Sequence, residues 1–227
     1  MNKTRLPFRN VMRYVWISLC FLTFLGIFQI ASAQNSDIGL WSGVTLKKKV
    51  TKKVSFHLRQ EFRFNQNISL LKQNLTEVGL HYKLGKRTTL IPGYRFSFLR
   101  SGINHRIYTD LIHKLNTNGK LPTIEFRLRG LRSFSGEGDW NYTIRTRAQF
   151  AYPIEDFPMK PFVSAELFYS FVPTTHDFSR YRFVAGSKFK ISDTFSLSTA
   201  YQFQKKMNKT DPISENNILV ALKVNLK

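Results

Sequence analysis

Three Arg-Xxx-Arg pairs are the residues of this sequence best suited to chemistry: Arg127-Leu128-Arg129, Arg145-Thr146-Arg147 and Arg180-Tyr181-Arg182. In an extended strand, residues two apart point to the same side, so each pair aims two guanidinium groups in one direction. A guanidinium is always charged, and its planar fork of donors fits carboxylate, sulfate or phosphate. The spacing therefore predicts that strands in this protein form a surface able to hold anions.

Residues for nucleophilic or acid–base chemistry carry no specific motif. Ser55 and His57 share a face of their segment, as do Glu77 and His81, but such pairs are common on polar faces and lack a catalytic signature. The five histidines are scattered without the spacing of a zinc or iron site. We therefore expect no catalytic residue, no metal and no cofactor, and a lipid-modifying enzyme is the weakest of the functional hypotheses.

The elements that position the arginines are strands with one apolar and one polar face. Apolar and polar residues alternate in the segment 54–64, and the same alternation recurs in the segments 195–204 and 218–226. This two-residue repeat is typical of a barrel in lipid, with apolar side chains outward and polar ones in the lumen. The rival interpretation is a soluble periplasmic sandwich or calyx, which would expose large apolar patches unless they were covered.

The first residues predict export. Residues 1–33 carry Lys3, Arg5, Arg9 and Arg13, then an almost wholly apolar run, and end in the small residues Ala31-Ser32-Ala33, as cleaved signal peptides do. The alternative is an uncleaved anchor, but the run is shorter than the roughly 20 residues that a span needs. We expect a cleaved signal peptide, followed by one domain at 34–227. With only 14 acidic residues and 31 basic residues outside the leader, that domain would carry a net charge of +17.

Eleven segments of about strand length are separated by turn signals. Single-chain bacterial barrels usually have an even number of strands, so we predict an all-β, antiparallel transmembrane β-barrel of about 12 strands, with 10 also compatible. Short turns at 51–53, 85–87 and 192–193 alternate with longer loops at 65–72, 135–140, 173–177 and 205–215. The eleven candidate segments are 38–47, 54–64, 74–84, 88–99, 105–115, 122–133, 141–152, 161–171, 179–190, 194–204 and 216–226.

Three segments together resemble a known family. They are Asp37-Ile38-Gly39-Leu40-Trp41-Ser42-Gly43, the hairpin from Lys47 to Phe64, and the closing strand that begins Glu215-Asn216-Asn217. The sequence resembles the domain-of-unknown-function family 2490, which comprises outer-membrane β-barrel proteins of Gram-negative bacteria. The resemblance implies an outer-membrane location and a porin-like fold. It implies no activity, because its motifs are those of barrel construction.

Extending the alternation through every strand places most charged residues on the predicted lumen face, where basic residues outnumber acidic ones. An excess of arginine favours passage of anions, which predicts an anion-preferring channel for small acidic solutes. The alternative is a plugged structural or binding barrel, in which arginine–glutamate pairs fill the lumen without conductance. The candidate anion contacts are Arg59, Arg63, Arg95, Arg127, Arg129, Arg145, Arg147, Arg180 and Arg182.

The expected partners follow from this location. They are outer-membrane lipid and lipopolysaccharide, the barrel-assembly machinery and small anionic solutes. Lys47-Lys48-Lys49 with Lys52-Lys53 could contact lipid headgroups on one side of the membrane, and Lys205-Lys206 could contact lipopolysaccharide on the other. A strongly basic chain can also bind nucleic acid, but export through a signal peptide makes nucleic acid an unsuitable partner.

Overall fold

A computed structural model describes residues 37–116, 121–135, 140–155, 157–172, 175–208 and 214–226. The predicted signal peptide, residues 1–33, lies outside the described residues. No helix in the described part of the chain is long and apolar enough to cross a membrane.

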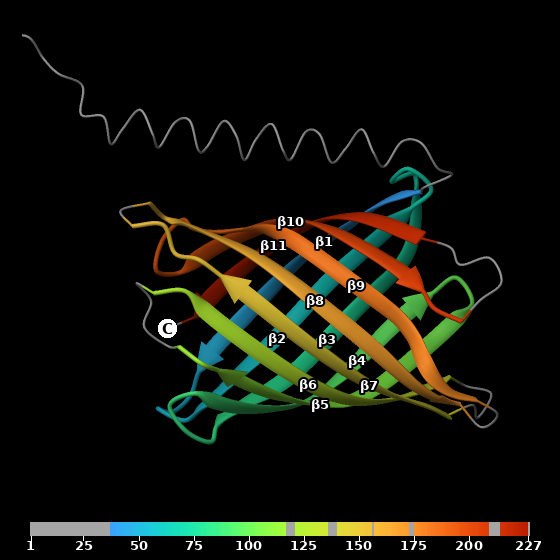
Figure 1. Cartoon of the computed structure of the whole chain (residues 1–227), viewed down its shortest axis with the longest axis horizontal. Coiled ribbons are helices and arrows are strands. Elements are labelled where there is room, and N and C mark those ends of the chain that lie inside the picture. The colour runs from blue at the N-terminus through green and yellow to red at the C-terminus, as the bar shows by residue number, and fades with distance from the viewer. Residues whose placement is uncertain are drawn as a thin grey trace, which may run out of the picture. The chain divides into compact units, whose positions relative to one another are not determined.

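Eleven strands within the described residues close into one barrel, and each runs obliquely around its wall (Figure 1). All eleven segments expected from the sequence are present as strands. Their bounds are β1 (Ile38–Lys49), β2 (Val54–Asn65), β3 (Leu70–Lys83), β4 (Thr88–Leu99), β5 (Gly102–Lys114), β6 (Thr123–Ser135), β7 (Trp140–Ala151), β8 (Met159–Val172), β9 (Thr175–Lys190), β10 (Phe195–Lys206) and β11 (Ser214–Leu226).

The expectation of a twelfth strand is wrong for the described chain. Each strand from β1 to β11 pairs antiparallel with the next, and the barrel closes where β1 pairs with β11 in parallel, with Leu40 opposite Ile218 and Val44 opposite Leu222. In a meander with an odd number of strands, the first and last strands run in the same direction, so a parallel ladder is the only way to close it. The usual even number of strands is therefore not required here.

The two faces of the wall differ as the alternation predicts. Phe56, Leu58 and Phe62 on β2 point outward and are 39–51% exposed, whereas Glu61 between them is 3% exposed. The aromatic residues Tyr94, Phe98, Tyr142 and Phe150 on other strands, and Tyr152 just after β7, are also well exposed. An outer surface of this kind requires lipid around it, because water would otherwise contact a continuous apolar belt.

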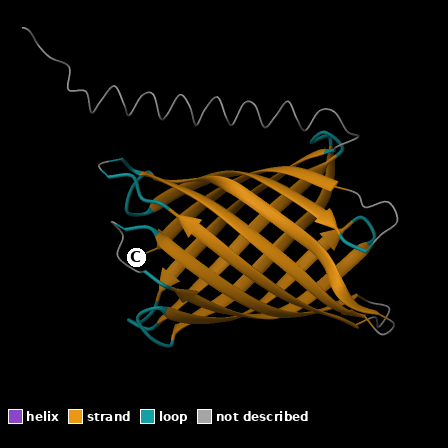
Figure 2. Ribbon diagram, viewed as in Figure 1, coloured by secondary structure: helices purple, strands orange, loops and turns teal. Residues whose placement is uncertain are grey.

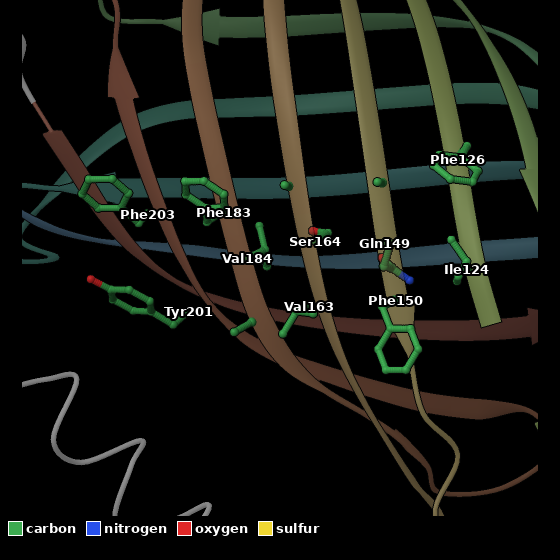
Figure 3. Close-up of a pocket in the computed structure, with 13 residues that line it drawn as sticks. Ile124, Phe126, Gln149, Phe150, Val163, Ser164, Phe183, Val184, Tyr201 and Phe203 are labelled. Carbon is green, nitrogen blue, oxygen red and sulfur yellow. The ribbon is translucent and has the colours of Figure 1, made fainter. Parts of the chain in front are cut away.

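The outward face also carries an apolar groove of about 540 Å³ over β6 to β10 (Figure 3). Small residues form its floor, with Ala148 paired to Ala165 and Ala185 paired to Val163 across the neighbouring strands. Phe126, Phe150, Phe183 and Phe203 line it.

The turns fall on two opposite rims (Figure 2). The C-terminal rim has the turns 50–53, 84–87 and 191–194 and the end of β11, and the N-terminal rim has the start of β1 and the turns 66–69 and 100–101. The expected long loop at 65–72 is half strand, because Leu70 and Leu71 pair with Asn65 and Phe64. In the expected loop at 173–177, residues 175–177 belong to β9 and pair with β8. A register shift beside each of these segments lets pairing continue where the sequence pattern breaks.

Two glycines make room for rings inside the wall. Gly79 on β3 is paired with Gly93 on β4, and their Cα atoms face the lumen. The imidazole of His57 lies over Gly79 and the phenol of Tyr108 lies over Gly93, so that a Cβ at either position would overlap the ring. The absence of a side chain at these two positions therefore leaves room for one ring from β2, next to β3, and for one ring from β5, next to β4.

Candidate functional site

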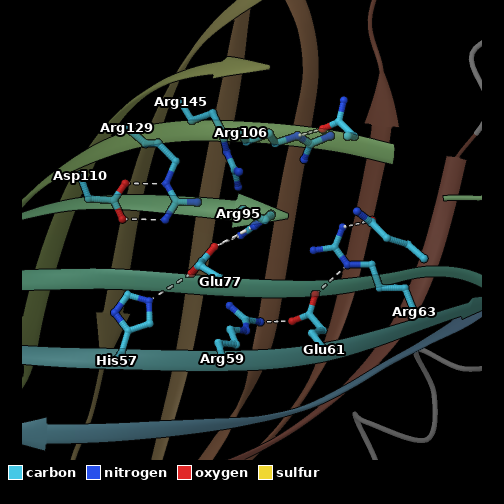
Figure 4. Close-up of polar contacts among 12 residues, drawn as sticks. His57, Arg59, Glu61, Arg63, Glu77, Arg95, Arg106, Asp110, Arg129 and Arg145 are labelled. Atoms are coloured by element: carbon cyan, nitrogen blue, oxygen red, sulfur yellow. Dashed lines mark hydrogen bonds and ion pairs between the residues drawn. The ribbon is translucent and has the colours of Figure 1, made fainter. Parts of the chain in front are cut away.

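The inward side chains of β2 and β3 form the first of the charged clusters (Figure 4). Glu61 accepts hydrogen bonds from both Arg59 and Arg63, with Arg63 Nε 2.7 Å from Oε1. Arg63 also donates to the amide oxygen of Gln73 at 3.2 Å. One carboxylate thus serves two guanidinium groups that lie two residues to either side of it on the same strand, as the alternation of β2 dictates.

A second cluster joins β2 through β6. Arg95 donates to Oε2 of Glu77, with its Nε at 2.8 Å, and Arg129 makes a bidentate pair with Asp110 at 2.5 and 2.7 Å. His57 Nε2 lies 3.4 Å from Glu77 Oε1, and His81 Nε2 lies 2.9 Å from His57 Nδ1. The structure therefore connects both histidines to one carboxylate, while among the described residues no hydrogen bond joins Ser55 to the network.

The third cluster is centred on one carboxylate. Glu166 on β8 accepts from Arg127 Nη2 at 2.6 Å, from Arg145 at 3.0 and 3.1 Å, and from Arg182 Nη1 at 3.1 Å. These three arginines come from β6, β7 and β9 and represent all three Arg-Xxx-Arg pairs. Arg147, which forms an Arg-Xxx-Arg pair with Arg145, donates instead to Glu125 at 2.5 Å.

Two inward arginines have no carboxylate within ion-pair distance among the described residues. Arg106 donates to the amide oxygen of Asn104 at 2.9 Å, and Arg180 lies with its guanidinium carbon 5.7 Å from the centroid of the Phe168 ring. The Nε atoms of Arg127 and Arg147 are buried and have no hydrogen-bond partner among the described residues. Donor capacity in the lumen therefore exceeds what the described carboxylates accept.

Aromatic rings support the guanidinium groups from the inner wall. The Arg129 guanidinium carbon lies 4.1 Å from the centroid of Tyr108, and Arg145 and Arg182 lie 4.5 and 4.9 Å from that of Phe168. Cation–π contacts of this kind fix the plane of a guanidinium. The roles of Tyr108 and Phe168 were not predicted from the sequence, although each residue shares its face with predicted lumen residues on its own strand.

The space open to solvent inside the lumen differs along the length of the barrel. At its centre Glu77, Asp110, Arg95, Arg129 and Arg145 are only 3–9% exposed, so side chains nearly fill it. Toward the C-terminal rim it widens into a cavity of about 240 Å³, whose lining includes the arginines 59, 127 and 129 together with Lys47 and Lys223. No group of three or more metal-ligating side chains occurs in the described part of the chain.

The fold and the inward charged face define a porin-like β-barrel of the outer-membrane type. The sequence profile of the protein family described as "Protein of unknown function (DUF2490)" matches residues 38–215. The chain therefore belongs to that family, as the three segments in the sequence suggested. No curated protein sequence matches it significantly.

Solved structures share the fold at low sequence identity. A bacterial polysaccharide outer membrane secretin matches with a TM-score of 0.51 and 8% identity, over 75% of this chain and 63% of the secretin. The chain thus spans less than two thirds of that protein. The NanC porin matches with a TM-score of 0.50 and 15% identity, over 83% of this chain and 99% of the porin, and the KdgM porin with 0.45 and 16%, over 70% and 80%.

Proposed function

We propose that this protein is exported to the outer membrane and forms an anion-preferring channel for small acidic solutes, with an arginine-rich lumen as the path. The supporting observation is the charge imbalance in the described lumen. Glu166 is shared by three arginines and Glu61 by two, while Arg106 and Arg180 have no carboxylate within ion-pair distance among the described residues. A wall that is positive after its carboxylates are paired attracts anions and repels cations.

Solvent access divides five of the nine candidate arginines into two groups. Arg59 and Arg147 have side chains 33% and 21% exposed and lie on the C-terminal side of the central clusters, where a solute can reach them. Arg95, Arg129 and Arg145 are nearly buried and hold the wall in shape. We assign solute contact to the first group and positioning to the second, and we assign no catalytic role to any of them.

A plugged structural or binding barrel is the second candidate, and the filled centre of the lumen favours it. Buried arginine–carboxylate pairs of this density stabilise a closed cross-section when their geometry is good. In that case the cavity near the C-terminal rim would bind an anion without passing it on.

Conductance separates the two candidates. The purified barrel is inserted in a planar bilayer under a salt gradient, and the reversal potential gives the ratio of anion to cation permeability. The channel proposal expects steady, anion-selective currents. Replacing Arg106 and Arg180 by Gln should shift the reversal potential toward the value for cation permeation, because it removes two positive charges from the lumen wall. The variant should still fold, because neither arginine lies within ion-pair distance of a described carboxylate. Silence from a folded, heat-modifiable barrel would overturn the channel proposal in favour of the plugged barrel.

A matched control removes the same charge elsewhere. Arg87 and Arg100 lie in exposed turns on opposite rims, outside the lumen clusters. Their replacement by Gln should leave the reversal potential within a few millivolts of the wild-type value. An equal shift in both double variants would mean that net charge, and not the lumen wall, sets the selectivity.

A further inference from the structure

The lumen mouth at the C-terminal rim contains a pocket of about 360 Å³ whose lining includes no arginine, although Lys47 and Lys223 also line the neighbouring cavity that holds Arg59, Arg127 and Arg129. It lies between the ends of β1, β3 and β11 and the turn 50–53. Six lysines line it, and none of its described lining residues is acidic. The lining lysines are Lys47, Lys49, Lys52, Lys53, Lys83 and Lys223.

The six lysines have no ion-pair partner among the described residues. Elsewhere on this rim, Lys114 lies 3.5 Å from Glu125 and Lys190 lies 2.6 Å from Asp193. Lys47 is close enough to Lys83, Lys114 and Lys223 for their charges to repel its own. Uncompensated like charges held together in a concave mouth raise the free energy of the empty pocket, and a bound anion would lower it.

The pocket is also built on an ordered turn. The Thr51 hydroxyl oxygen accepts from the backbone N–H of Lys53 at 3.2 Å and of Val54 at 3.0 Å, and the backbone N–H of Lys83 donates to the carbonyl of Lys53 at 2.9 Å. The turn is thereby fixed against the end of β3. The lysines on it consequently extend from a defined backbone.

The donor types select the class of anion. An ammonium is a compact point charge without the planar fork that suits a carboxylate, and several around one centre suit a phosphate group with its spread of charged oxygens. Ser55 and Asn225, which also line the pocket, add a hydroxyl and an amide as neutral donors. The volume lies at the lower end of the range for small-molecule sites.

We propose that this lysine pocket binds phosphate-bearing anions at the C-terminal mouth of the barrel. The phosphate can belong to a soluble compound with two or more phosphate groups or to an anionic lipid headgroup at the rim. The proposal concerns binding at the mouth and does not depend on conduction through the centre of the lumen.

Titration with inorganic pyrophosphate tests the proposal. The full chain is expressed, the folded barrel is extracted from membranes into detergent, and binding is measured by calorimetry at two salt concentrations. We expect saturable binding that weakens as salt rises, and a loss of affinity of about tenfold or more when Lys83 and Lys223 are both changed to Gln. Both side chains are exposed, so the variant should fold, and its heat-modifiable mobility checks this.

The control variant is Lys205→Gln with Lys206→Gln, which removes two lysines from the opposite rim and should bind within about twofold of wild type. Equal affinity of the pocket variant and wild type would overturn the proposal, as would the absence of binding both to pyrophosphate and to phosphatidylglycerol. Nanodiscs distinguish the sources of phosphate. If phosphatidylglycerol in place of phosphatidylcholine blocks pyrophosphate, lipid headgroups occupy the pocket; if pyrophosphate still binds, the ligand is soluble.

Discussion

The guanidinium carbon of Arg63 lies 3.7 Å from the centroid of the Trp41 ring, and that of Arg182, from the far side of the closing seam, lies 5.4 Å from it. Trp41 is 8% exposed and lies on the lumen face of β1, which it shares with Gly39 and Thr45. The ring therefore joins β1, β2 and β9 on the inside of the barrel.

The Trp41 ring should make a measurable contribution to stability. Changing Trp41 to Ala removes a buried ring and two cation–π contacts, and we expect a loss of about 3 kcal/mol in the free energy of unfolding. Urea unfolding in lipid vesicles measures it. Trp41→Phe keeps a ring for Arg63 and should lose much less, so equal losses in both variants would show that packing around the indole, and not ring support, matters.

Glu166 should be the most sensitive carboxylate in the lumen. Replacing it by Gln leaves the guanidinium groups of Arg127, Arg145 and Arg182 without their shared anion, and we expect a loss of about 3 kcal/mol because these charges are largely buried. The same unfolding measurement applies. Glu155→Gln, in an exposed turn, removes the same charge and should change stability by less than about 0.5 kcal/mol.

The paired glycines should not tolerate a methyl group. Gly79→Ala would push against the His57 ring and Gly93→Ala against the Tyr108 ring, and each should cost about 1–3 kcal/mol through overpacking. Gly130→Ala is the matched control, since a Cβ there has no neighbour within 4 Å. Combining His57→Ala with Gly79→Ala should recover part of the loss, and no recovery would place the strain in the backbone.

The parallel seam can be tested by cross-linking. In a Cys20→Ser background, Leu40→Cys with Ile218→Cys places two thiols on directly paired residues of β1 and β11, and oxidation should form a disulfide that changes gel mobility. Leu40→Cys with Leu222→Cys is offset by four residues along β11 and should remain reduced. Cross-linking in the offset pair alone would contradict the register of the eleven-stranded barrel.

The strands and the two faces of the wall could be predicted from the sequence because a strand has a strict two-residue period. Once Phe56 and Phe62 point outward, Arg59, Glu61 and Arg63 must point inward. The resemblance to a known family was also confirmed, because the family profile matches residues 38–215. The closure of the barrel was not predictable in this way: the pattern marked all eleven segments, and a twelfth strand was expected only because single-chain barrels usually have an even number. A side-chain pattern marks where strands lie and not whether the last pairs parallel or antiparallel with the first.

The carboxylate that each arginine pairs with also could not be predicted from the sequence pattern. Alternation places Arg127, Arg145, Arg182 and Glu166 on the inner face, but the convergence of three strands on one carboxylate depends on the register between β6, β7, β8 and β9. Register arises from pairing along the whole wall and from the shift at Phe168 and Tyr169. The assignment of anion contacts and the leader at residues 1–33 remain predictions.

The parallel seam between β1 and β11 also places the two ends of the described barrel on opposite rims. Because the described barrel crosses an odd number of times, Asp37 leaves it on one side of a membrane and Leu226 on the other. An even-stranded barrel returns both ends to the same side. A tag placed before β1 and one placed after β11 would therefore be open to opposite aqueous spaces, and insertion of this barrel must carry one end of the chain across the lipid.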